Sequence, residues 1–181
     1  MFFSDLLRLA LLKCYGGVWV DATFLFTAPI PYKFSEMEFF IFQRSPQAKN
    51  KEKWGRLNSD YFSWEECHRV NFLSSMMFSK AENKTVSILL QLMLWYWKTQ
   101  ENIPHYFFFQ ILFDELKREI LIEEFELVDD TLPHLLFAEL DNPFNQQKLD
   151  EITAQCNQHK LTYVTECHEN SFYAHLKNKY Q

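Results

Sequence analysis

The feature that most constrains the fold of this chain is residues 4–23, where charged residues sit in an apolar helical segment that leads into a short strand. Every residue of 6–12 except Arg8 is Leu or Ala, and a helix that is apolar on nearly all sides is normally buried. Ser4 is a favourable N-cap, so we expect the helix to begin there. Asp5 and Arg8 lie three residues apart on one helix face, so we expect their charges to pair.

Two adjacent glycines follow this helix, and the whole chain has only 3 Gly. Gly16 and Gly17 suit a left-handed helix end and a tight turn, and residues 18–20 are β-branched or aromatic, which is typical of a strand. Asp21 falls at the carboxyl end of that strand, where ligands bind in open α/β sheets. The alternatives are structural: the helix pair only stabilises the helix, and Asp21 only begins a turn.

These residues resemble a known motif of the capsular polysaccharide synthesis family of glycosyltransferases. The resemblance rests on Ser4-Asp5-Leu6-Leu7-Arg8 and on Gly16-Gly17-Val18-Trp19-Val20-Asp21-Ala22-Thr23. It extends in outline over residues 4–163, although only 4–23 is specific. The family is related to sugar transferases with a DxD motif. The resemblance implies an α/β fold of the GT-A type, with a mixed sheet flanked by helices, and the transfer of a sugar from a nucleotide-sugar donor to a capsular or other cell-surface polysaccharide.

The resemblance also implies roles for individual residues. Asp5 holds the ribose or base side of the donor, and Arg8 contacts the donor sugar or its phosphates. Asp21 matches the first Asp of the DxD motif and contacts the sugar or the shell of a metal ion. These three are the expected catalytic residues, and the donor-binding set also includes Gly16, Gly17 and Thr23.

Metal dependence stays open, because Thr23 stands where metal-binding relatives have the second Asp of the motif. Mg²⁺ and Mn²⁺ prefer oxygen ligands. Such an ion could lie between Asp21 and the donor diphosphate, with the Thr23 hydroxyl or water completing its shell.

The resemblance continues more weakly downstream. Residues 70–79 and His105-Tyr106-Phe107 are similar to the family segment beyond the donor site, and residues 160–163 resemble a family ending motif. His105 and Tyr106 are therefore acceptor-side candidates, with His105 as a possible base. The alternative for His105 is a helix-start or packing role.

We expect a single glycosyltransferase domain over 1–181, with residues 1–80 forming the donor part and 81–181 a mainly helical acceptor part for a glycan or lipid-linked glycan. The family carries nucleotide-binding strands ahead of its Ser-Asp-x-x-Arg motif, and here that motif begins at Ser4. The first strands are thus expected to be lacking. A rival hypothesis follows, namely a truncated, catalytically silent relative that acts as an interaction subunit.

Composition excludes several classes of function. The formal charge of −6 argues against nucleic-acid binding, and the glycine patterns of dinucleotide and P-loop sites are absent from the sequence. No secretory leader pattern opens the chain, so we expect a cytoplasmic protein that could act at the inner face of the cytoplasmic membrane. Leu90, Met93, Leu94 and Trp97 form a stripe that either contacts that membrane or belongs to the core.

Two further clusters could bind metal. Cys156, His159, Cys167 and His168 form a conceivable zinc set, although their spacing is unlike that of common zinc fingers. Asp129 and Asp130 could hold a cation, but adjacent carboxylates of this kind are more often exposed turn residues.

Hydrophobic patterns predict the remaining elements. Strands are expected at 38–43, 70–78 and 161–165, and helices at 83–99, 104–118, 145–158 and 169–179. Residues 44–56 are rich in charge and predict a mobile loop, and residues 119–144 predict loops with a short strand.

Overall fold

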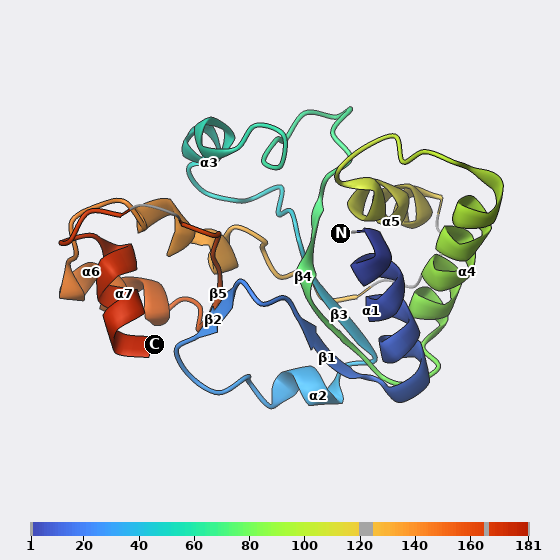
Figure 1. The fold of residues 1–181 in the computed structure, drawn as a ribbon, viewed down its shortest axis with the longest axis horizontal. Coiled ribbons are helices and arrows are strands. Elements are labelled where there is room, and N and C mark those ends of the chain that lie inside the picture. The colour runs from blue at the N-terminus through green and yellow to red at the C-terminus, as the bar shows by residue number, and fades with distance from the viewer. Residues whose placement is uncertain (1, 120–124, 165–166, 181) are drawn as a thin grey trace. The chain divides into compact units, whose positions relative to one another are not determined.

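The computed structural model describes residues 2–119, 125–164 and 167–180. The chain divides into two compact units (Figure 1). The first unit comprises Met1–Val20 and Tyr32–Asp130, and the second comprises Asp21–Pro31 and Thr131–Gln181.

A three-stranded sheet organises the first unit. Its order is β1 (Gly17–Val20), β4 (Phe72–Ser79) and β3 (Phe39–Gln43). Both pairings are antiparallel, and all of β4 is buried because it is the central strand. The strands predicted at 18–20, 38–43 and 70–78 are confirmed. Every named strand of the described residues pairs antiparallel, so the expected mixed sheet is replaced by small antiparallel sheets.

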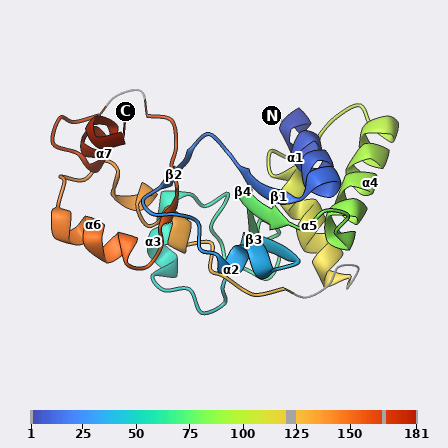
Figure 2. The same cartoon turned by 90° about the horizontal axis from the view of Figure 1, so that it is seen from below.

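Helices cover this sheet on the side seen at the right of Figures 1 and 2. The long ones are α1 (Phe2–Tyr15), α4 (Lys84–Thr99) and α5 (Phe108–Arg118). Helices α1 and α5 pack on β4, and α4 packs on α1. Their apolar faces join the sheet in one core, whose fully buried members include Leu9, Ile41, Met77, Leu89, Met93 and Phe113. The core therefore lies between the helices and the sheet.

Several elements of this unit differ from the sequence predictions. Helix α1 already begins at Phe2, so Ser4 lies inside the helix and is not its N-cap. Helix α5 begins at Phe108 rather than at Pro104. The predicted loop 44–56 contains the short helix α3 (Lys51–Leu57), which Trp54 anchors because its side chain is buried. A further short helix, α2 (Lys33–Glu36), precedes β3.

The second unit pairs two short strands and carries helices around its own core. Strand β2 (Phe24–Phe26) pairs antiparallel with β5 (Gln158–Lys160). The helices are η1 (Leu132–His134), η2 (Phe137–Glu139), α6 (Gln146–Thr153) and α7 (Phe172–Tyr180). The core contains Leu136, Leu140, Leu149, Ile152, Phe172 and Leu176. The strand predicted at 161–165 is wrong, since β5 ends at Lys160; its last residue, Thr165, lies outside the described residues.

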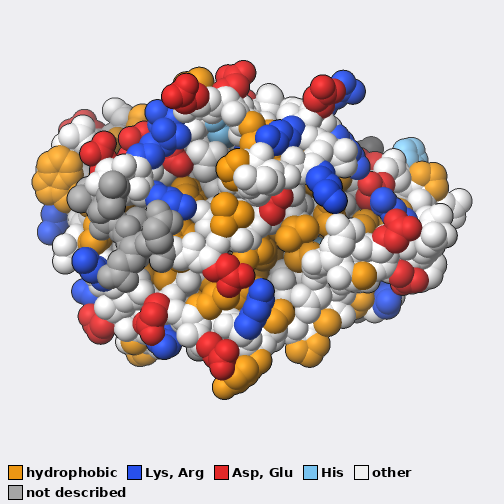
Figure 3. Space-filling view, turned by 180° about the vertical axis from the view of Figure 1, so that it is seen from behind, with side chains coloured by type: hydrophobic (Ala, Val, Ile, Leu, Met, Phe, Trp, Pro, Cys, Tyr) orange, Lys and Arg blue, Asp and Glu red, His pale blue; other side chains and the backbone are white. Residues whose placement is uncertain are grey.

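The stripe on α4 is divided between the core and the surface. Met93 is fully buried and Leu90 packs against the core, whereas Leu94 and Trp97 stay partly exposed. No helix in the described part of the chain is both long and apolar enough to cross a membrane. On the face shown in Figure 3, acidic and basic side chains of the described residues are interspersed.

Candidate functional site

The connection from α1 to β1 depends on its two glycines. Gly16 has φ +66° and Gly17 has φ +95°, both in the left-handed region. A Cβ atom on Gly16 would lie 2.7 Å from the backbone nitrogen of Ala81 and 2.9 Å from the carbonyl oxygen of Ser79. The predicted tight turn is therefore confirmed, and Gly16 also permits a close approach to the chain that leaves β4.

Asp5 and Arg8 form the predicted ion pair. The Nη1 atom of Arg8 lies 2.7 Å from Oδ1 of Asp5, and their side chains are 3% and 14% exposed. The Arg8 guanidinium also lies 5.3 Å from the ring centroid of Trp19 and 5.6 Å from that of Phe109. Two aromatic rings and the Asp5 carboxylate thus lie close to this buried cation, an arrangement that lowers the cost of burying it.

Asp21, Thr23 and Lys160 come together in the second unit. The chain turns directly after β1, with the Phe24 N–H donating to the Asp21 carbonyl at 3.0 Å. The Lys160 ammonium donates to Oγ1 of Thr23, and the Leu161 N–H donates to the Thr23 carbonyl at 2.9 Å. Burial lowers the pKa of Lys160, while the negative charge of Asp21 acts in the opposite direction and favours the ammonium form.

The predicted donor-site residues are divided in sequence between the two units. Asp5 and Arg8 form one group, and Asp21 and Thr23 form the other. Lys160 is a member of the second group that sequence reasoning did not single out. Its only signal was its place in the four-residue motif at 160–163.

The second group fits a divalent metal ion poorly. It offers one carboxylate, and the Thr23 hydroxyl already accepts a hydrogen bond from an ammonium. Mg²⁺ and Mn²⁺ need several oxygen ligands, and a neighbouring cation opposes their binding. Among the described residues, no group of three or more His, Cys, Asp or Glu side chains could hold a metal. That finding also removes the zinc set of Cys156, His159, Cys167 and His168, in which Cys156 and His159 are buried while Cys167 and His168 are exposed.

The acceptor-side candidates lie just before α5 and are exposed. The Nδ1 atom of His105 accepts a hydrogen bond from the Phe107 N–H at 3.1 Å, and the His105 carbonyl accepts from the Phe108 N–H at 3.2 Å. These bonds fix the turn that leads into α5. Tyr106 is 63% exposed.

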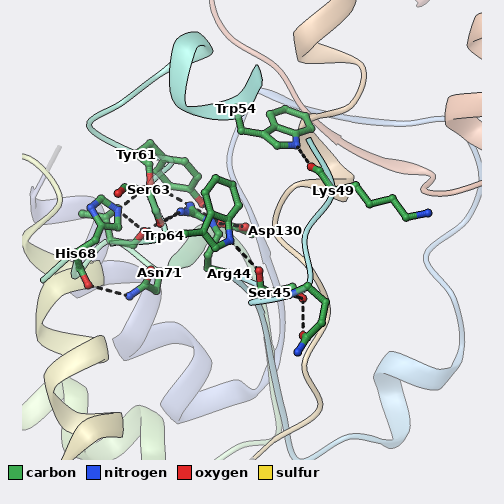
Figure 4. Close-up of polar contacts among 12 residues, drawn as sticks. Arg44, Ser45, Lys49, Trp54, Tyr61, Ser63, Trp64, His68, Asn71 and Asp130 are labelled. Atoms are coloured by element: carbon green, nitrogen blue, oxygen red, sulfur yellow. Dashed lines mark hydrogen bonds and ion pairs between the residues drawn. The ribbon is translucent and has the colours of Figure 1, made fainter. Parts of the chain in front are cut away.

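A buried charge cluster in the first unit was missed. Arg44 follows β3 and donates from Nε and Nη2 to the two carboxylate oxygens of Asp130, at 2.8 and 2.9 Å (Figure 4). The hydroxyl of Tyr61 donates to Oδ2 of Asp130 at 3.0 Å. Burial lowers the pKa of Arg44, but its bonds to Asp130 outweigh this and the pKa lies above its ordinary value. Burial and the charge of Asp130 raise the pKa of Tyr61 well above its usual range.

This cluster corrects the interpretation of Asp129 and Asp130 as exposed turn residues. The side chain of Asp130 is fully buried and paired with Arg44. Its neighbour Asp129 forms an isolated bridge with Gln43 at the end of β3. The Asp130 carboxylate is therefore used by Arg44 inside the first unit, and the backbone around Asp129 pairs with the end of β3.

Comparison with known protein families identifies a match that covers most of the chain. Residues 1–176 match the model of a protein family described as capsular polysaccharide synthesis protein. No curated protein matches the chain. No solved structure matches it either.

Proposed function

The chain belongs to the capsular polysaccharide synthesis protein family, and from this premise we propose that it is a glycosyltransferase of GT-A type. It moves a sugar from a nucleotide-sugar donor to a capsular or other cell-surface polysaccharide acceptor. In this reaction the bond between the anomeric carbon and the diphosphate breaks, and a bond from that carbon to an acceptor oxygen forms. The hydroxyl proton of the acceptor passes to a base, and the nucleoside diphosphate leaves with its electron pair.

The observation that carries the proposal is the ammonium of Lys160 on the Thr23 hydroxyl, next to Asp21. Metal-binding relatives place a second carboxylate at the position of Thr23. A departing diphosphate needs preorganised positive charge. We assign that charge to Lys160, so that the reaction needs no divalent ion, and we assign contact with the donor sugar to Asp21.

Arg8 acts through Asp5 in this proposal. Arg8 is almost fully buried, whereas the Asp5 side chain is 14% exposed. An ion pair with a rigid guanidinium fixes the carboxylate of Asp5 in one orientation. Asp5 is thereby prepared to accept hydrogen bonds from the hydroxyl groups of the donor ribose.

A donor titration tests the proposal. UDP-glucose, UDP-galactose and GDP-mannose are added to the wild-type chain and to the variants Lys160→Met, Asp21→Asn and Asp141→Asn, and the heat of binding is recorded. We expect saturable binding of at least one donor, a loss of at least tenfold in affinity for the first two variants, and no change for Asp141→Asn, because Asp141 is exposed. EDTA is expected to leave the affinity unchanged.

Two results would contradict the proposal. Binding that survives in both Lys160→Met and Asp21→Asn removes the donor role of this group. Binding that disappears with EDTA and returns with Mn²⁺ shows that a metal supplies the charge assigned to Lys160.

An interaction subunit is the second candidate function. Helix α1 exposes apolar side chains at a spacing of four residues, so they lie on one helix face; they are Phe3, Leu7, Leu11 and Tyr15. A silent subunit that uses this face gives no saturable heat with any nucleotide sugar. The same titration therefore separates the two candidates.

A further inference from the structure

A pocket of about 520 Å³ opens within the first unit, away from α1 and the β1 turn. Its walls come from the end of β3, the segment that follows α3, the start of β4 and the last turns of α5. Its volume lies in the range of about 300–1,000 Å³ that is typical of small-molecule sites.

The buried charge cluster makes one wall of this pocket rigid. Arg44 donates to the carbonyl oxygens of Tyr61 and Ser63, each at 3.0 Å, in addition to its bonds to Asp130. The indole N–H of Trp64 donates to the Ser45 carbonyl at 2.8 Å. The segment 61–64 is therefore fixed to the end of β3, and Trp64 is held half-buried in the wall (Figure 4).

The contacts of His68 determine which of its ring nitrogens carries a proton. Its Nε2 atom lies 3.0 Å from the Tyr61 carbonyl oxygen and 3.2 Å from the Val70 carbonyl oxygen. Carbonyl oxygens only accept hydrogen bonds, so Nε2 must be the protonated nitrogen. In the neutral ring, Nδ1 is then a hydrogen-bond acceptor, and His68 lines the pocket.

Asn71 offers a second acceptor. Its amide nitrogen donates to Oδ1 of Asp114 at 2.9 Å and to the His68 carbonyl at 3.2 Å. Both amide protons are used in these bonds, which leaves the amide oxygen to accept. Asp114 is itself fixed, because Nε of Arg118 donates to its Oδ2 at 2.7 Å. The polar groups of this wall are thus held in place before any ligand arrives.

The charges of the lining balance. Three cations, Arg44, Lys117 and Arg118, face three carboxylates, Glu65, Glu66 and Asp114. A site for a diphosphate needs an excess of positive charge, and this pocket has none in its formal lining charges. An aromatic ring with oriented, charge-neutral polar groups instead suits an uncharged ligand that has both apolar C–H faces and hydroxyl groups.

We propose that this pocket binds a neutral saccharide. The indole of Trp64 packs against the C–H face of the sugar ring, while Nδ1 of His68 and the amide oxygen of Asn71 accept hydrogen bonds from its hydroxyl groups. Resting on the proposed function, the saccharide is a sugar unit of the acceptor glycan. Trp64, His68 and Asn71 then determine which acceptor is recognised.

The test uses the indole N–H signal of Trp64 in ¹H–¹⁵N spectra, identified by its loss in Trp64→Phe. The probes are methyl α-glucopyranoside, methyl α-galactopyranoside, N-acetylglucosamine and inorganic pyrophosphate. We expect at least one saccharide to shift the Trp64 signal saturably, and pyrophosphate to leave it in place. His68→Gln keeps a donor near Nε2 and removes Nδ1, so we expect it to weaken saccharide binding at least tenfold.

Trp64→Leu is expected to weaken binding by a similar factor, and Trp95→Leu is its matched control, because Trp95 is 61% exposed on α4 and does not line the pocket. If Trp64→Leu does not fold, His68→Gln still decides the matter. The proposal is overturned if pyrophosphate alone shifts the Trp64 signal, if no saccharide shifts it, or if His68→Gln binds saccharide as well as the wild type. These readouts need no nucleotide sugar, so a failed donor titration and a failed saccharide titration are separate results.

Discussion

Arg44 and Asp130 illustrate, at the scale of single residues, what keeps a full charge inside an apolar unit. The guanidinium uses Nε and Nη2 for the carboxylate and its remaining donors for backbone carbonyls, so few of its N–H groups are left unsatisfied. It also lies about 5 Å from the ring centroids of Tyr61, Phe62 and Trp64. Removing either partner of such a pair leaves the other charge buried without compensation.

Asp130→Ala is therefore expected to destabilise the chain by about 3–5 kcal/mol. Arg56→Ala is the matched control, because its partner Glu52 is 91% exposed and surface pairs contribute little. Urea unfolding followed by tryptophan fluorescence measures both. Equal midpoints for Asp130→Ala and Arg56→Ala would show that the Arg44 cluster does not stabilise the unit.

Cys156 gives a chemical prediction at the same scale. Burial raises its pKa from 9.0 to about 11, whereas Cys14, Cys67 and Cys167 are exposed. At pH 8 we expect iodoacetamide to modify those three thiols and to leave Cys156 intact until the chain is unfolded. Peptide mass mapping counts the modified sites, and rapid labelling of Cys156 in the native chain would contradict the described packing. The pKa of Cys156 is higher in the folded chain than in the unfolded chain, so between pH 9 and about 11 the unfolded chain loses this thiol proton first. The free energy of unfolding therefore falls as pH rises through this window.

Residue contacts were predictable where the partners are close in sequence. Asp5 and Arg8 are three residues apart on a helix, so helical geometry alone indicated their contact. Arg44 and Asp130 are 86 residues apart, and Thr23 and Lys160 are 137 apart. No local pattern encodes such contacts, which is why the sequence alone indicates neither the burial of Asp130 nor the contact of Lys160 with Thr23.

At the scale of elements, predictions that rest on a local pattern are correct, and those that depend on a partner distant in sequence are not. Strands β3 and β4 are apolar runs, and α4 has the helical pattern together with Asn83, whose Oδ1 accepts from the Val86 N–H. Strand β5 is Gln-His-Lys and carries no strand pattern; it exists because β2 offers it backbone partners. Secondary structure that depends on a distant partner could not be predicted from local composition.

The turn between α1 and β1 yields the prediction for this scale. In Gly16→Ala the new methyl group clashes with the backbone of Ala81 and Ser79, and the residue must also keep a positive φ. We therefore expect the free energy of unfolding to fall by about 2–4 kcal/mol. Gly55→Ala, inside α3, has its nearest neighbour at 3.8 Å and is expected to be neutral or stabilising by about 0.5–1 kcal/mol. Thermal unfolding compares the two variants. A Gly16→Ala protein as stable as the wild type would show that the turn tolerates a side chain.

At the scale of the whole molecule, the chain passes between its two units at 20/21, 31/32 and 130/131, so each unit is built from segments distant in sequence. The second unit holds a titratable group in its interior. His159 is fully buried, its Nε2 atom lies 3.1 Å from Oγ1 of Thr27, and burial lowers its pKa from 6.5 to about 4. The folded form of this unit therefore contains a neutral imidazole.

The sign of the resulting pH dependence follows from linkage. Between pH 6.5 and about 4 the unfolded chain binds a proton at His159 that the folded chain excludes, so the stability of the second unit falls as pH falls through this window. The full shift corresponds to a loss on the order of 3 kcal/mol. Amide hydrogen exchange at pH 4.5 measures this loss. We expect residues 131–164 to exchange faster in the wild type than in His159→Gln, and residues 72–99 of the first unit to exchange at the same rate in both proteins. The glutamine keeps a donor toward Thr27 and cannot take up the proton.

His168→Gln is the control variant and should exchange like the wild type, since His168 is exposed. An identical exchange pattern in wild type and His159→Gln would mean that His159 is protonated without cost, and that the interior of the second unit admits water.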